Sequence, residues 1–265
     1  MGVSPWRWVE PSLYEGPSPF PSEKMRLDHY LVQSGLMESR ARAQEAIAAG
    51  HVTVNGAVAA KPAQKVSESD DVAISGEVPP YVSRGGMKLE AALRAMEINP
   101  SGKICLDLGA STGGFTDVLL RAGAVKVYAV DVGQGQLHEK IAGDPRVVNL
   151  EKTHAKDLNR ELVPDPLAVI VCDVSFISLK KALPFALALA APGCQVAALV
   201  KPQFEVGREG IGKGGLVKDG LAEPCARDIA HWIEAQGWTV AGLIDSPILG
   251  GDGNREFLIG ATKKA

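Results

Sequence analysis

The sequence has few cysteines, little net charge and no metal-ligand pattern, and each of these absences excludes a class of protein. The four cysteines among its 265 residues are widely spaced and form no C-x-x-C pair, so zinc sites and disulfides are not expected. The formal net charge of −3 excludes a protein that coats nucleic acid by overall charge, so such a partner must meet local basic patches. The five histidines show no ligand spacing, and we expect no bound metal.

A long apolar run is also missing. The segment 183–200 contains no charged residue, but Pro192 and Gly193 break it into a helix end and a following strand, which argues against a membrane span. Residues 1–24 hold five prolines and no apolar run, which excludes a secretory signal of the usual form and predicts a disordered arm. The regular pattern begins at Met25, which is an alternative start of translation. We expect a cytoplasmic protein without a membrane partner.

The chain is long enough for two domains. Apolar residues make up 46% and charged residues 22% of the sequence, as in folded globular proteins, and 265 residues suffice for one α/β domain and a smaller one. The segment 76–82 contains Gly76, Pro79 and Pro80 and predicts an extended linker. We therefore expect a first domain at 25–75 and a second at 83–265.

The first domain is predicted to hold two helices and a small sheet. One helix carries Leu27, Tyr30 and Leu31 on a single face, and the second begins at the N-cap Ser39 and ends at Gly50. Short strands are expected at 51–54, 61–66 and 71–74, the first of them entering an Asn-Gly turn. The segment resembles the S4 RNA-binding domain in residues 26–28, 39–44, 50–56 and 61–62.

Basic residues of this domain are candidates for RNA contacts. Arg40 and Arg42 open the second helix, and Arg26 and Lys61 are expected to flank the same face. Such cations contact the phosphates and 2′-hydroxyls of folded RNA largely by shape. Ordinary solvated helix residues are the alternative, and Arg84 at the start of the second domain is a fifth candidate.

The second domain is organised around residues 103–115. A buried strand at 104–108 runs into a glycine-rich loop and then into a helix at 115–122, and the strand at 126–131 ends in Asp131, placed to hold a ribose. The loop departs from G-x-G-x-x-G and looks like the first motif of adenosylmethionine-dependent methyltransferases; a tight strand-to-helix turn without a ligand is the alternative. The expected cofactor residues here are Asp107, Gly109, Ser111, Thr112, Gly113, Gly114, Phe115 and Asp131.

Strands and helices alternate through the rest of the chain, which predicts an α/β doubly wound, Rossmann-like sheet. Further strands are expected at 147–150, 167–173, 195–201 and 239–244, and further helices at 178–190 and 221–236. The connection at 250–253 is too short for a crossover helix, so the last strand, 256–261, should pair antiparallel.

This topology predicts that four charged residues meet at one edge of the sheet. Asp173 and Lys201 end parallel strands, and Glu256 begins the antiparallel strand at the same edge. Lys88 lies on the helix that precedes the sheet and could fold over that edge. Taken singly, a strand-end acid is often a turn residue and a lone lysine is usually solvated, but the four together form a candidate catalytic group.

The order Lys88, Asp173, Lys201, Glu256 resembles the K-D-K-E tetrad of the FtsJ-like RNA 2′-O-methyltransferases. With the S4-like segment in front, the chain resembles the TlyA family of rRNA methyltransferases, also labelled hemolysin A. Further matching stretches are 83–89, 107–117, 173–179 and 200–205. The resemblance also implies that Asp157 contacts the adenine side of the cofactor. One departure lies in the same stretch, residues 153–157, where the family pattern would have an Asn and an Arg in place of His154 and Lys156.

The resemblance implies transfer of a methyl group from S-adenosyl-L-methionine to a ribose 2′-hydroxyl of rRNA, in this family on a cytidine. Asp173 then also belongs among the cofactor residues, and the partner is ribosomal RNA or a ribosomal subunit. Lys201 is the candidate group at the hydroxyl, with Asp173 and Lys88 positioning it and Glu256 completing the network. Two acids favour a charged lysine, whereas Lys88 and desolvation oppose it, so a neutral base and a stabilising cation both remain open.

Other readings leave part of the sequence unexplained. A nicotinamide dehydrogenase would not use the S4-like segment or the tetrad, and a non-catalytic RNA-binding module would not need the four charged positions. A membrane-lysing protein would need a spanning or basic amphipathic helix, and none is predicted. Residues 207–214 nearly spell a P-loop, but Gly214 replaces the required Ser or Thr. We interpret this segment as a lid over the substrate.

Overall fold

The computed structural model describes residues 24–37, 39–48, 50–67, 69–74 and 81–264. The chain divides into two compact units between residues 78 and 79, and each unit is described by itself. The predicted arm at 1–24 lies outside the described residues except for Lys24, and so does most of the predicted linker at 76–82.

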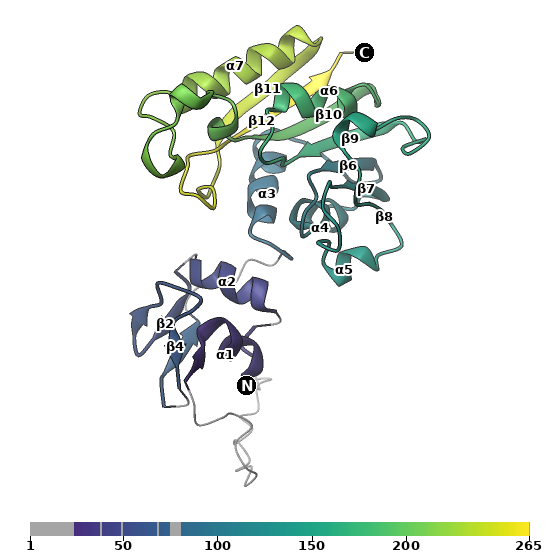
Figure 1. Cartoon of the computed structure of the whole chain (residues 1–265). Coiled ribbons are helices and arrows are strands. Elements are labelled where there is room, and N and C mark those ends of the chain that lie inside the picture. The colour runs from purple at the N-terminus through teal and green to yellow at the C-terminus, as the bar shows by residue number, and fades with distance from the viewer. Residues whose placement is uncertain (1–23, 38, 49, 68, 75–80, 265) are drawn as a thin grey trace, which may run out of the picture. The chain divides into compact units, whose positions relative to one another are not determined.

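The N-terminal unit contains the two predicted helices and short antiparallel strands (Figure 1). Its elements are β1 (Met25–Arg26), α1 (Leu27–Gln33), α2 (Arg40–Ala48), β2 (Val52–Val54), β3 (Ala57–Val58), β4 (Lys65–Val66) and β5 (Val72–Ile74). Strand β2 pairs with β3 and β5, and β1, which was not predicted, pairs with β4. The apolar faces of α1 and α2 form the core, in which Leu27, Leu31 and Ala43 are fully buried.

A buried acid holds the two helices of this unit together. Asp28 has no exposed surface. It accepts hydrogen bonds from Arg26 Nε at 2.9 Å, Arg40 Nη2 at 3.2 Å and Gln44 Nε2 at 2.8 Å. The hydrogen bonds from Arg26 hold the pKa of Asp28 far below its ordinary value. Two of the predicted RNA ligands, Arg26 and Arg40, are therefore partly engaged inside the domain, although their side chains remain 39% and 54% exposed.

The C-terminal unit is a seven-stranded sheet with helices on both faces (Figure 1). The strand order is β11-β12-β10-β9-β6-β7-β8. The strands are β6 (Ile104–Leu108), β7 (Lys126–Val130), β8 (Val147–Leu150), β9 (Leu167–Cys172), β10 (Ala190–Val200), β11 (Trp238–Asp245) and β12 (Phe257–Lys263). Strand β12 is antiparallel to both of its neighbours, which confirms the predicted doubly wound sheet with one reversed strand.

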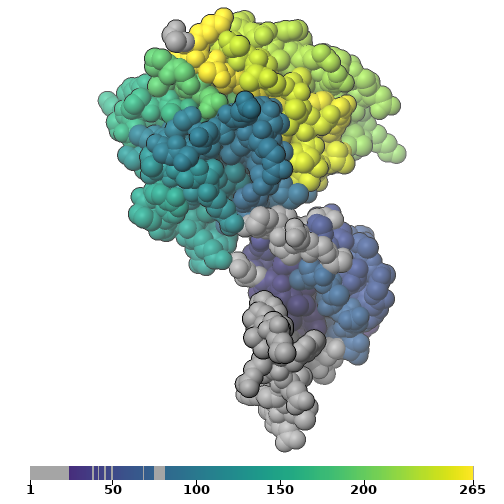
Figure 2. All heavy atoms as spheres, turned by 180° about the vertical axis from the view of Figure 1, so that it is seen from behind, coloured from purple at the N-terminus to yellow at the C-terminus, as the bar shows by residue number. Residues whose placement is uncertain are grey.

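Two helical layers cover this sheet. The helices are α3 (Gly85–Ala95), α4 (Gly114–Arg121), α5 (Glu139–Ala142), α6 (Leu179–Leu187) and α7 (Ala222–Ala235). One hydrophobic core joins the sheet to α3, α4 and α5, and the other joins it to α6 and α7. In the view of Figure 2, the blue residues around α3 adjoin the yellow residues of the C-terminal strands. Helix α3 thus packs beside β10 and β12, at the position where Lys88 can reach the sheet edge.

Several boundaries differ from the sequence prediction: the strand expected at 61–66 is only Lys65–Val66, and the largest changes surround β10. Strand β10 begins at Ala190 instead of residue 195, and its pairing with β9 shifts register between Ala190 and Gln195. Gly193 lies within this irregular stretch with a φ of +72°, which lets the chain bulge out of the ladder and resume pairing. Helix α6 accordingly stops at Leu187 and not at residue 190. The sheet edge that carries the charged residues is not affected.

We predict that Asp28→Asn destabilises the N-terminal unit at neutral pH, by about 2 kcal/mol, because it weakens charge-assisted hydrogen bonds. Since folding lowers the pKa of Asp28, its contribution is present above the unfolded pKa of about 4 and is lost as the pH falls through the folded value. Hydrogen exchange of residues 25–74 in the full chain at pH 7 and at acid pH measures this. If the wild type and the variant differed in stability by the same amount at both pH values, the predicted role of the Asp28 charge would be wrong.

Candidate active site

The carboxyl ends of the parallel strands form the edge at which the predicted residues gather. Asp173 directly follows β9 and donates its backbone N–H to Leu108 O at the end of β6, at 2.9 Å. Val200, the last residue of β10, pairs with Phe257, the first residue of β12. The antiparallel direction of β12 therefore brings Glu256 beside Lys201, as its sequence position predicted.

The four charged residues form two ion pairs. Lys201 Nζ lies 2.6 Å from Asp173 Oδ1 and donates to Ser175 Oγ at 2.7 Å. Lys88 Nζ lies 2.5 Å from Glu256 Oε2. The Lys88–Glu256 pair is the deeper one, with side chains 7% and 3% exposed, against 12% for Lys201 and 21% for Asp173. Because the group contains two cations and two anions, each charge is compensated locally, as buried charges require.

A cavity of about 490 Å³ opens beside these pairs, and Lys201 and Glu256 both line it. Phe176 and Phe204 supply two aromatic rings to its wall, with centroids 5.2 Å apart. The Phe176 side chain is 91% exposed and its φ is +64°, a left-handed conformation that is rare for a bulky residue. Sequence reasoning included Phe176 in a matching stretch but gave it no role, because neither its exposure nor its backbone conformation is visible in the sequence.

The glycine-rich loop leaves room for a ligand and for a second loop. A Cβ at Gly109 would lie 2.5 Å from Asp173 O, so no other residue fits between these strand ends, and its φ of +87° also favours glycine. Ser111 N donates to Asp131 Oδ2 at 2.8 Å, and Gly133 N donates to Asp131 Oδ1 at 2.7 Å. Asp131 therefore joins the loop after β6 to the loop after β7, where the sequence predicted a ribose ligand.

Asp107 is a buried acid beneath this loop. Its Oδ2 accepts from Thr116 Oγ1 at 2.7 Å, whereas Oδ1 has no hydrogen-bond partner among the described residues. Burial raises the pKa of Asp107 to about 7. An unused carboxylate oxygen beneath a loop rich in glycine fits a cationic amino-acid ligand, and the α-amino group of S-adenosylmethionine is such a group.

The remaining predicted residues lie in different surroundings. Gly114 and Phe115 face the start of α3, where a Cβ at Gly114 would meet the hydroxyl of Ser83 and the Phe115 ring is buried. Gly113 is the N-cap of α4 with a φ of +96°, and Thr112 O accepts from His138 N at 3.1 Å. These four residues shape the loop through its backbone and packing.

Asp157 is exposed on the 3-10 helix η1 (Ala155–Asp157), which packs against α6. Arg84 precedes α3 and reaches the turn at Gly251, where a Cβ would lie 2.8 Å from Arg84 Nη2. In the N-terminal unit, Lys61 is exposed, and the backbone N–H of Arg42 donates to Ser39 Oγ at 3.3 Å.

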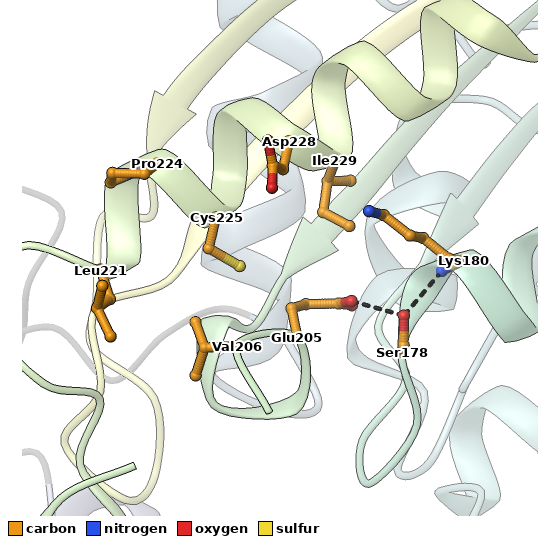
Figure 3. Close-up of a pocket in the computed structure, with 9 residues that line it drawn as sticks. All are labelled: Ser178, Lys180, Glu205, Val206, Leu221, Pro224, Cys225, Asp228 and Ile229. Atoms are coloured by element: carbon orange, nitrogen blue, oxygen red, sulfur yellow. Dashed lines mark hydrogen bonds between the residues drawn. The ribbon is translucent and has the colours of Figure 1, made fainter. Parts of the chain in front are cut away.

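A second cavity of about 370 Å³ lies between the start of α6, helix α7 and residues Glu205 and Val206, which follow the 3-10 helix η2 (Pro202–Phe204) (Figure 3). Figure 3 shows the Glu205 carboxylate directed toward Ser178, with Cys225 on the α7 side. Glu205 accepts from Ser178 Oγ at 2.6 Å and from Leu179 N at 2.7 Å, and burial raises its pKa. Because Glu205 caps α6, it fixes the segment that carries Asp173 and Phe176 to the end of β10.

The cysteine of the second cavity is not an activated nucleophile. Burial raises the pKa of Cys225 to about 11, so its thiol stays protonated.

In the described part of the chain, no group of three or more His, Cys, Asp or Glu side chains is arranged to hold a metal ion. Among those same residues, no helix has the length and apolar character needed to cross a bilayer.

Comparison with known proteins connects this site to one group of enzymes. Residues 81–263 match the family described as FtsJ-like methyltransferase, and residues 25–72 match the S4 domain. The 16S/23S rRNA (cytidine-2′-O)-methyltransferase TlyA of Mycobacterium tuberculosis is 42% identical over 90% of this chain and 90% of that protein. Hemolysin A of Brachyspira hyodysenteriae is 44% identical over 88% of this chain and 98% of that protein.

A solved structure is similar over most of this chain. A candidate hemolysin from Streptococcus thermophilus superposes with a TM-score of 0.73 at 41% sequence identity, and the match covers 92% of this chain and 90% of that chain. The two units and their order are therefore shared with an experimentally determined relative.

We predict that Asp107→Asn stabilises the C-terminal unit at alkaline pH and weakens cofactor binding. Folding raises the pKa of Asp107 to about 7, so its favourable contribution is fully present below the unfolded pKa of about 4 and is lost as the pH rises from there through about 7. Each pKa unit corresponds to about 1.4 kcal/mol, so the gain is at most a few kcal/mol.

Thermal unfolding at pH 5.5 and pH 8.5 measures this effect, with titration calorimetry of S-adenosylmethionine alongside. The gain in unfolding temperature of the variant over the wild type should be larger at pH 8.5 than at pH 5.5. An equal shift of the unfolding temperature at both pH values would show that Asp107 does not titrate near neutrality. An unchanged affinity for S-adenosylmethionine would show that Asp107 does not serve the cofactor.

Proposed function

The chain belongs to the TlyA family of FtsJ-like methyltransferases, and on that premise we propose that it methylates the 2′-hydroxyl of a cytidine ribose in ribosomal RNA, in the cytoplasm. The observation that carries the proposal is the Lys201–Asp173 ion pair at the mouth of a cavity, one strand away from the glycine-rich loop. Methyl transfer requires that the acceptor hydroxyl and the methyl group of the cofactor lie side by side. The carboxyl edge of the sheet meets this requirement, because it carries both the cavity and the glycine-rich loop.

S-adenosylmethionine supplies a methyl group on a positively charged sulfur. Asp131 is placed to hold the ribose of this cofactor, because a carboxylate that accepts from Ser111 N and Gly133 N still has free lone pairs for hydroxyl groups. Asp107 Oδ1 is the unused acceptor for the amino group. Gly109 keeps the space between β6 and β9 free of side chains.

Lys201 acts on the hydroxyl as a cation in this proposal. Its ammonium lies 2.6 Å from Asp173 Oδ1 and donates to Ser175 Oγ at 2.7 Å, so these two groups fix its position. A cation at that position stabilises the negative charge that the 2′-oxygen gains as its O–H bond breaks, while the methyl group would pass from the sulfur to that oxygen and leave the sulfur neutral. The hydroxyl proton leaves to water through the open side of the cavity.

The cavity receives the target nucleotide. Phe176 and Phe204 offer ring faces on which a base can stack, and Lys201 lies on the same wall to meet the ribose. A nucleotide inside a duplex reaches such a pocket only when it is turned out of the stack. The exposed Lys61, and the N–H groups of Arg26 and Arg40 that Asp28 does not use, are the proposed phosphate contacts of the N-terminal unit.

The function is tested by incubating the purified protein with labelled S-adenosylmethionine and separate small and large ribosomal subunits. Mass spectrometry of the rRNA should then locate a methyl group on a cytidine 2′-oxygen. Binding of NAD without binding of S-adenosylmethionine would favour a dehydrogenase instead. Absence of label from both subunits would overturn the proposal.

We predict that Lys201→Ala lowers kcat roughly 10²–10³-fold, the usual loss when one electrostatic stabiliser is removed. Lys201→Arg separates the two possible roles, since arginine stays protonated and cannot act as a base. A retained fraction of activity in Lys201→Arg, well above that of Lys201→Ala, is expected for the cation. Equal inactivity of both variants, with wild-type cofactor affinity, would point to a neutral base.

A further inference from the structure

The outer wall of the substrate cavity is formed by a segment that has little packing of its own. Ile211 and Gly215 line the cavity, and this glycine-rich stretch includes the 3-10 helices η3 (Arg208–Gly210) and η4 (Lys213–Gly215). Most of the side chains from Gly207 to Gly220 are exposed. Glycine-rich backbone loses more conformational freedom on ordering than other backbone does, so this segment needs ties from outside.

Asn254 provides such a tie. Its side chain is 3% exposed, its Oδ1 accepts from Val217 N at 2.8 Å, and its Nδ2 donates to Gly215 O at 3.1 Å. One amide group thus satisfies a donor and an acceptor of the wall, as a neighbouring strand would. Hydrogen bonds within the wall include Gly212 N to Leu216 O at 2.7 Å and Lys218 N to Gly210 O at 2.9 Å.

Asn254 also belongs to the turn that precedes Glu256. Gly250 N donates to Asn254 O at 2.9 Å, and Asn254 N donates to Asp252 Oδ1 at 3.1 Å. Asp252 in turn accepts from Gln203 Nε2 at 3.1 Å, which connects the turn to η2. In Figure 1 the green loop before α7 and the yellow loop before β12 lie side by side, and these bonds join them.

We propose that Asn254 is a positioning residue that fixes the 211–217 wall against the Glu256 turn and thereby sets how tightly the enzyme holds the target nucleotide of its RNA. The inference rests on the proposed function, since it takes the cavity as the nucleotide site. The cofactor loop at 109–114 and Asp131 lie on the far side of Asp173 and have no hydrogen bond to Asn254. Loosening the wall therefore lowers the affinity for RNA and does not change the affinity for the cofactor.

The test compares Asn254→Asp and Asn254→Ala with the wild type. Asp keeps an acceptor for Val217 N–H but places a second oxygen against Gly215 O, and Ala removes both bonds. For each variant we expect a roughly tenfold higher KM for the ribosomal substrate, the effect of losing one or two net hydrogen bonds. We expect kcat within about threefold and an unchanged dissociation constant for S-adenosylmethionine, because the interaction is not specific to the transition state.

Hydrogen exchange measures the wall directly. Residues 211–218 should exchange faster in both variants while the sheet does not change. Asn99→Asp is the matched control, since it makes the same change of charge at the opposite edge of the sheet, where Asn99 Oδ1 accepts from Ser101 N at 3.0 Å. This control should keep the wild-type KM.

The outcomes separate this inference from the function on which it rests. An unchanged KM for RNA, or a loss of cofactor affinity together with the rise in KM, would overturn the role of Asn254. A wild-type enzyme that methylates no rRNA would overturn the proposed function, whereas the exchange measurement would still show whether Asn254 holds the wall.

Discussion

The buried ion pair between Lys88 and Glu256 is the constraint on which the site depends. It joins residues 168 positions apart in the chain, one on α3 and one at the start of β12, and both side chains are almost fully enclosed. Removing either partner would leave a lone charge in the interior, at a cost of about 3–5 kcal/mol. Helix α3 can therefore pack on the sheet only in the position that brings Lys88 to the carboxyl edge.

This constraint divides the four charged residues by task. Lys88 and Glu256 are enclosed and hold the edge together, and a Cβ at Gly250 would lie 2.7 Å from Glu256 Oε1, so the turn before β12 closes over that acid. Lys201 and Asp173 are more open, at 12% and 21% exposed, and Lys201 lines the cavity. Because the Lys88–Glu256 pair fixes the strand ends, the Lys201–Asp173 pair keeps its position without being fully buried. The ammonium group of Lys201 therefore remains available to a substrate.

The sequence predicted that the charged residues gather at the carboxyl edge of the sheet, but not which of them form ion pairs. Strand direction is readable from connection lengths, so the gathering of Asp173, Lys201 and Glu256 followed from topology alone. Which lysine pairs with which acid depends on strand register and on the exact place of α3. The same limit applies to Asp28, whose contacts with Arg26 and Arg40 come from the packing of two helices, and to Asn254, a turn residue in the sequence that is a buried tie in the fold.

The two edges of the sheet differ in how completely their polar groups are satisfied. At the amino edge, Lys126 and Tyr128 both donate to Asp165, at 2.7 and 2.5 Å. At the carboxyl edge, Asp107 keeps an unused buried oxygen and Phe176 holds a strained backbone. Such features destabilise a folded protein unless the surrounding structure holds them, and they gather where a ligand will use them. The Lys88–Glu256 pair, the Glu205 cap and the Asn254 tie all act at this edge, and they are what allows it to remain unsatisfied until cofactor and RNA arrive.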